Sequence, residues 1–131
     1  MPFLSFDAAL AIALGHTPNT DSFAFQSSFT LSSAAPAIKP LTQPVTIQTG
    51  NYSVTIPPGS FKRGDSSYDF SGVIDGVTLT AKIAPAGTLR YTFAATTSAG
   101  VNLSGIKNPV PVGLTIGEDC GKASVTATIT P

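Results

Sequence analysis

The sequence has few side chains that carry charge or do chemistry. Only 11% of its 131 residues are charged, seven basic against seven acidic, with one histidine, one cysteine and no tryptophan. This sparse, balanced charge excludes the basic surface that holds nucleic-acid phosphates and the polybasic stretch that binds anionic lipid. We therefore expect no nucleic-acid partner. We also expect no membrane span, because no stretch reaches about 18 uninterrupted apolar residues.

The residues of common catalytic and zinc sites are also scarce. The single histidine, His16, lies in a stretch containing Gly, Pro and Asn that is typical of a loop, and no G-x-S-x-G elbow is present. A zinc site needs more Cys or His ligands than one of each, and a lone Cys120 cannot form an intramolecular disulfide. We expect His16 on a surface loop, Cys120 at a buried or half-buried position, and no enzymatic activity.

Short stretches of alternating apolar and hydroxyl side chains fill most of the chain. Ser and Thr supply 31 of the 131 residues, and 42% of residues are hydrophobic in a patterned order that argues against disorder. A Gly-Asn pair divides residues 45–56 and an Asp-Gly pair divides residues 68–83, so each stretch predicts a two-residue β-hairpin. In the second hairpin Asp69 should face Lys82, because a register one residue off would bury both charges.

Similar stretches predict about seven strands between residues 22 and 130. One of them, residues 22–31, places four large apolar side chains on one face, namely Phe23, Phe25, Phe29 and Leu31. Short one-sided strands at this spacing predict an all-β fold, an antiparallel β-sandwich of immunoglobulin-like type. A small barrel is the alternative. The length suits one such domain, which we place at residues 21–131.

The N-terminal segment, residues 1–20, differs from the rest. Its apolar residues fit a helical stripe that begins near Ser5 and ends at Gly15, and its alanines favour a helix. The same residues also alternate as in a strand, so a short helix and an extended arm both stay open. The segment must pack on its own domain or on another copy, as a donated strand would. Self-association would then use Leu4, Phe6, Leu10, Ile12 and Leu14.

Two loops carry acidic side chains that could hold calcium. Glu118 and Asp119 are adjacent in the turn at residues 117–121, and Asp65 lies in another loop. Calcium takes oxygen ligands of this kind from loops, although a plain turn explains the same residues without a cofactor. Carbohydrate binding through polar loops is a further hypothesis, weakened by the absence of Trp and by the inward positions predicted for all three Tyr.

Several phrases of the sequence resemble a known kind of module. "YSVTIPPGSFK", "YDFSGVIDGVTLTAKI" and "GVNLSGIKNPVPVGLTIGEDCG" are similar to phrases in β-sandwich modules of secreted or surface bacterial proteins of unassigned function. The resemblance covers roughly residues 22–130, implies an extracellular or cell-surface location, and brings no catalytic residues.

The function expected from the sequence is that of a non-catalytic structural or adhesive module. Such a module acts through contacts with copies of itself or with neighbouring domains of a surface protein, and the N-terminal arm would serve self-association. The alternative is a carbohydrate- or calcium-binding module that acts through its loops.

Overall fold

The computed structural model describes residues 3–15, 21–31, 41–50, 52–64, 67–74, 76–87, 89–98, 101, 103, 106–117 and 119–130. These residues form eleven β-strands and contain no helix, so the predicted all-β fold is confirmed. The strands are β1 (Ser5–Ala13), β2 (Ser22–Thr30), β3 (Val45–Thr49), β4 (Tyr52–Ile56), β5 (Lys62–Arg63), β6 (Tyr68–Ile74), β7 (Val77–Gly87), β8 (Arg90–Thr97), β9 (Val110–Ile116), β10 (Asp119–Val125) and β11 (Thr128–Thr130).

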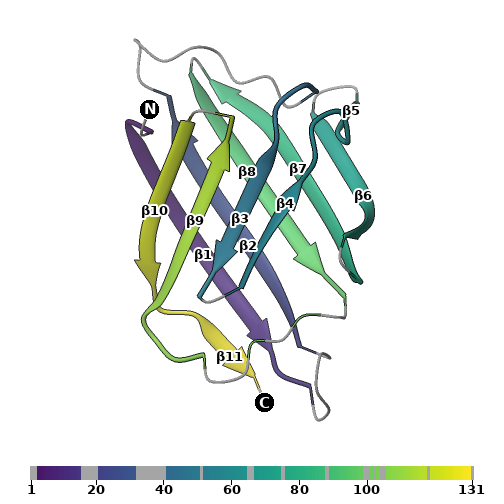
Figure 1. The fold of residues 1–131 in the computed structure, drawn as a ribbon. Helices are drawn as coiled ribbons and strands as arrows, with labels where there is room; N and C mark the ends of the chain where they lie inside the picture. The colour runs from purple at the N-terminus through teal and green to yellow at the C-terminus, as the bar shows by residue number, and fades with distance from the viewer. Residues whose placement is uncertain are drawn as a thin grey trace.

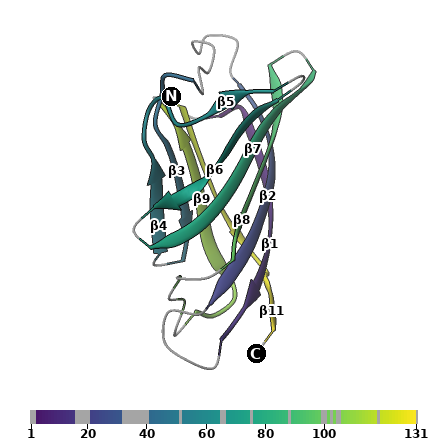
Figure 2. The ribbon, with the colours of Figure 1, turned by 90° about the vertical axis from the view of Figure 1, so that its right-hand side faces the viewer.

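The strands form two sheets that lie in two layers (Figures 1 and 2). The larger sheet has seven strands in the order β11-β1-β2-β8-β7-β6-β5, and the smaller has four in the order β10-β9-β3-β4. Among the pairs formed by the described residues, β1 and β11 run parallel and the others run antiparallel. The chain crosses from the smaller to the larger sheet between β10 and β11.

Both hairpin registers follow the sequence pattern. Thr49 faces Tyr52 at the end of the β3–β4 hairpin, and Gly50 has the positive φ, 61°, that the predicted turn requires. In the β6–β7 hairpin Asp69 faces Lys82, as expected from the need to keep both charges out of the core. The turn residues and the alternation of apolar and polar side chains together account for these registers.

The N-terminal segment is a strand, so of the two forms left open by the sequence the extended one is present and the helix is not. β1 pairs with β2 along all nine of its residues and with β11 on its other side. Period-two order places Leu10 and Ile12 in the core and Ala9 and Ala11 outside. Pairing on both edges of β1 outweighs the helix preference of its alanines, because propensity is a weak term beside tertiary packing. The proposed division at residue 20 lies outside the described residues.

The core fills the space between the two sheets and depends on aromatic side chains. Phe25 on β2 and Phe93 on β8 are buried and meet edge to face, with ring centroids 5.9 Å apart. The ring of Phe29 stacks against the rings of both Tyr91 and Phe3. The smaller sheet contributes an aliphatic layer of fully buried residues, namely Val45, Ile47, Ile56, Leu114 and Ile116.

The two sheets are linked along one side and end separately along the other. On the linked side the Phe3 amide donates to the Cys120 carbonyl at 2.7 Å. Here the rings of Phe3 and Phe6 lie against Gly121, where an added Cβ would be 2.5 Å from Phe3 Cδ2. Gly121 therefore lets the aromatic rings of the N-terminal segment lie flat on the smaller sheet. The other side, seen in Figure 2, ends in β4 in one layer and in β5 and β6 in the other.

Two polar side chains fix the connections at the strand ends. The buried carboxylate of Asp21 accepts from the Gly15 amide at 2.8 Å and from the Leu103 amide at 2.7 Å. The side-chain amide of Asn108 donates to the Ala127 carbonyl at 3.0 Å and accepts from the Ala127 amide at 2.7 Å. Asp21 thus holds the start of β2 beside the end of β1, and Asn108 holds the crossover between β10 and β11.

Candidate functional site

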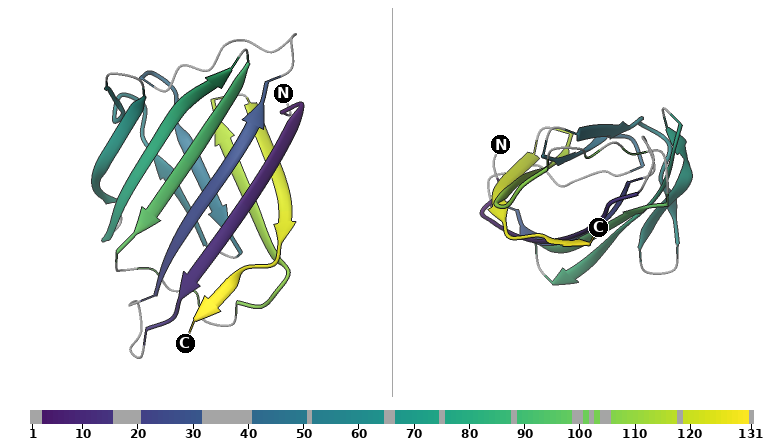
Figure 3. Two further views of the ribbon diagram at one scale, coloured as in Figure 1. Left: turned by 180° about the vertical axis from the view of Figure 1, so that it is seen from behind. Right: turned by 90° about the horizontal axis from the view of Figure 1, so that it is seen from below.

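The outer face of the larger sheet is not covered by any described element. Figure 3 (left) shows this face from outside, with β1, β2, β8 and β7 running across it. The alternation along these strands turns mainly small side chains outward. We call this surface the outer face; its residues are Ser5, Asp7, Ala9, Ala11, Ala13, Ser22, Ala24, Gln26, Ser28, Thr30, Thr78, Thr80, Lys82, Ala84, Arg90, Thr92, Ala94 and Thr96.

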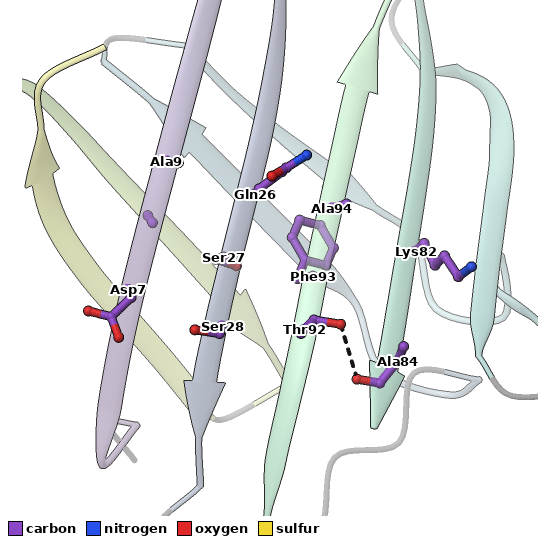
Figure 4. Close-up of a pocket in the computed structure, with 11 residues that line it drawn as sticks. Asp7, Ala9, Gln26, Ser27, Ser28, Lys82, Ala84, Thr92, Phe93 and Ala94 are labelled. Atoms are coloured by element: carbon purple, nitrogen blue, oxygen red, sulfur yellow. Dashed lines mark hydrogen bonds between the residues drawn. The ribbon is translucent and has the colours of Figure 1, made fainter. Parts of the chain in front are cut away.

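A shallow depression lies in the outer face where β1, β2, β8 and β7 run side by side (Figure 4). The register of these strands arranges its residues in two rows. One row reads Ala9, Gln26, Ala94, Lys82, and the other reads Asp7, Ser28, Thr92, Ala84. The depression exists because the alanines are short, so the charged side chains of Asp7 and Lys82 stand at opposite sides of a low floor.

The chemistry of the depression is that of hydrogen bonding on an open surface. Gln26, Ser28 and Thr92 offer amide and hydroxyl groups, and the Thr92 hydroxyl donates to the Ala84 carbonyl at 3.4 Å. No His or Cys is among the lining residues, and the two charged groups are the Asp7 carboxylate and the Lys82 ammonium. The depression also has no exposed aromatic ring, since Phe93 lines it from below and is buried. The surface is open, and its alanine side chains make much of the floor apolar.

The predicted calcium ligands are only partly placed. Asp119 is the first residue of β10 and is 2% exposed. Asp65 and Glu118 lie outside the described residues, as does His16. Across the described part of the chain, no three His, Cys, Asp or Glu residues come together. Cys120 is half-buried, as expected. Calcium binding by the two loops stays a prediction.

The residues predicted for self-association are divided between the core and the surface. Leu10 and Ile12 are buried between the sheets, Phe6 and Leu14 are half-buried, and Leu4 is 71% exposed. Within the single chain, then, the inward residues of β1 complete the chain's own core.

Sequence reasoning did not identify the outer face as one surface. It predicted a hydroxyl-rich exterior, and the alternation in residues 5–13 carried the signal that Ala and Asp side chains share a face. What it lacked was the order of strands, because β2 lies next to β8 and not next to β3. That neighbour relation brings Gln26 beside Ala94.

Comparison of the chain with models of protein families, with curated proteins and with solved structures finds no match. Among the described residues there is also no helix that could cross a membrane.

Proposed function

We propose that this chain is an extracellular, non-catalytic structural or adhesive module with an immunoglobulin-like β-sandwich fold. The fold assignment is supported by two sheets that share one core and are linked along one side. The location is supported by a charge-poor, hydroxyl-rich exterior and by the resemblance to secreted or surface modules. The observation that carries the functional proposal is the position of β1 between β2 and β11.

β1 is suited to exchange between copies of the chain. It pairs with β2 on one side and with β11 on the other, and its inward residues Leu10 and Ile12 are buried in the core. An identical strand from a second copy would make the same contacts, so the exchanged dimer keeps the pairing of β1 with β2 and β11 once β1 has left its own chain. The module would then associate with copies of itself through β1, as in donor-strand assemblies.

A disulfide trap tests this exchange directly. Ala11 and Ala24 lie opposite each other on β1 and β2 and both belong to the outer face, so a pair of cysteines there is close enough to oxidise. The variant A11C/A24C in a C120S background is refolded from urea over a range of protein concentrations and then oxidised. A folded monomer gives an internal disulfide, whereas an exchanged pair gives a covalent dimer on a non-reducing gel.

We expect the covalent dimer fraction to rise with the protein concentration during refolding. The single variant A11C/C120S is the matched control, because it has the same thiol on β1 without its opposite partner. Internally linked monomer at every concentration would show that β1 stays in its own chain, and self-association through the N-terminal arm would be abandoned.

A carbohydrate-binding module is the second candidate, and the depression in the outer face favours it. Gln26, Ser28 and Thr92 present hydrogen-bonding groups on an open surface of the kind that a sugar chain could contact. The test is retention of the protein on cellulose, chitin and dextran matrices, compared with a Q26A variant. Retention on a matrix that is reduced in Q26A would support this candidate. A protein that none of the three matrices retains would remove it.

A further inference from the structure

The free edge of the smaller sheet is β4, and it lacks the features that normally protect a sheet edge. β4 pairs with β3 on one side, and no strand of the described residues pairs with it on the other. Sheet edges are usually blunted by charge, proline, bulges or very short strands. The five residues of β4, YSVTI, contain no charge and no proline, and their pairing with β3 is regular.

Charge, short length or contact with another strand protects the other edges of the described sheets, except the part of β6 beyond β5. In the larger sheet, β5 covers the start of β6 with Lys62 and Arg63, and β11 has only three residues. At the far side of the smaller sheet, β10 lies against β1, where the Phe3 amide bonds the Cys120 carbonyl. The part of β6 beyond β5 contains Gly72, which weakens a strand because it has no side chain to pack.

The register of the β3–β4 hairpin shows which backbone groups of β4 are available. Thr49 and Tyr52 close a two-residue hairpin and therefore form a hydrogen-bonded pair. Alternate residues of β4 share this orientation, so Val54 and Ile56 also direct their amides toward β3. Ser53 and Thr55 direct their amides and carbonyls away from the sheet, and both residues are exposed.

We propose that β4 is a dimerisation edge, on which a second copy of this chain adds its own β4 in antiparallel orientation. The pattern of side-chain types in β4 is symmetric about Val54, with apolar residues at 52, 54 and 56 and hydroxyl residues at 53 and 55. A two-fold axis at Val54 therefore places Ser53 opposite Thr55 of the second copy. Each of these two pairs exchanges both backbone hydrogen bonds, which gives four bonds across the axis.

The same axis keeps the side chains of both copies on their proper faces. Tyr52 would lie opposite Ile56 of the second copy, which extends the inward apolar row across the interface, and the hydroxyl row continues outside. Pro57 follows the last residue of β4 and has no amide hydrogen, so the ladder stops after five residues. The result is a single eight-stranded sheet built from two four-stranded ones.

Sedimentation velocity over a concentration series tests the dimer, and amide exchange followed by NMR locates it. We expect a reversible dimer in which protection of the Ser53 and Thr55 amides rises with protein concentration, while that of Val54, already bonded to β3, does not. Exchange of β1 between copies would leave Ser53 and Thr55 unprotected, so the two kinds of self-association give different results. A protein that stays monomeric, or a dimer without added protection at Ser53 and Thr55, would overturn the proposal.

A pair of charge variants gives an independent check. S53K/T55K places like charges opposite each other twice across the axis and should weaken dimerisation by at least about tenfold. T80K/S124K adds the same charge to two exposed positions, one on each sheet, that lie away from β4 and should leave dimerisation unchanged. Equal weakening by both variants would mean that net charge, not β4, controls association. The unmutated protein still decides the question by amide exchange if S53K/T55K does not fold.

Discussion

Replacement of Asp21 should be among the most destabilising single changes outside the apolar core. The side chain is 7% exposed, and its two carboxylate oxygens each accept one backbone amide, from Gly15 and from Leu103. D21A removes both bonds and leaves two amides without their acceptor. A hydrogen bond to a charged group contributes about 1.5–3 kcal/mol. Because the two losses share one site and relaxation recovers part of them, we expect D21A to lower the free energy of unfolding by about 3–5 kcal/mol.

The isosteric variant D21N separates the two bonds from the shape of the side chain. The side-chain oxygen of Asn can still accept a hydrogen bond from one backbone amide, but its NH₂ group cannot accept a hydrogen bond from the other. We therefore expect D21N to lose about 1.5–3 kcal/mol, less than D21A. Asp7 on the outer face is the matched control, since it is an exposed acid on the neighbouring strand, and D7A should change stability by no more than about 0.5 kcal/mol.

Urea unfolding followed by circular dichroism measures all three variants. A loss of less than about 1 kcal/mol in D21A, similar to that in D7A, would refute the assignment of Asp21 as the link between the end of β1 and the start of β2. Exchange of the Gly15 and Leu103 amides gives a local readout, because both should exchange faster in D21A than in the unmutated protein. The connection that Asp21 holds is also the one that opens in strand exchange, so D21A should raise the dimer fraction in the disulfide trap.

Three further changes test the packing described above. G121A should cost about 1–3 kcal/mol in urea unfolding, because its Cβ would displace the aromatic rings that lie on β10, whereas G113A on β9 meets only ordinary contacts and should cost less. N108A should cost about 1–2 kcal/mol through loss of both bonds to Ala127, and a variant as stable as the unmutated protein would show that the crossover does not depend on them. I12A should cost about 2–5 kcal/mol if β1 completes the core, and a loss below about 1 kcal/mol would place β1 outside it.

Local pattern predicted the hairpins because the information needed was local. Facing residues such as Ile74 and Val77 are close in the sequence, and one turn plus one alternation sets their register. The sequence left helix and strand both open at the N-terminus for the opposite reason. β1 depends on β11, more than a hundred residues away, and no local preference reports that pairing.

The sequence could predict which types of side chain face outward, but not which of them lie next to each other on the surface. The sequence indicated that hydroxyl and small side chains would face outward, and this holds for Ser28 and Thr92. It could not show that these two lie side by side, because β2 and β8 are brought together by the order of strands. The contacts of Asp21 and Asn108 were missed for the same reason, since each side chain bonds a backbone segment that no short-range pattern links to it.

The parallel pairing of β1 and β11 determines how the molecule would respond to tension. β1 begins at one end of the two layers and β11 finishes at the opposite end (Figures 1 and 3). A pull applied between these ends would slide the two strands lengthwise past each other, so the bonds between Ala11–Ala13 and Thr128–Thr130 would be loaded at the same moment. Strands that are sheared in this way resist more force than strands that peel apart one bond at a time, which would suit a load-bearing link.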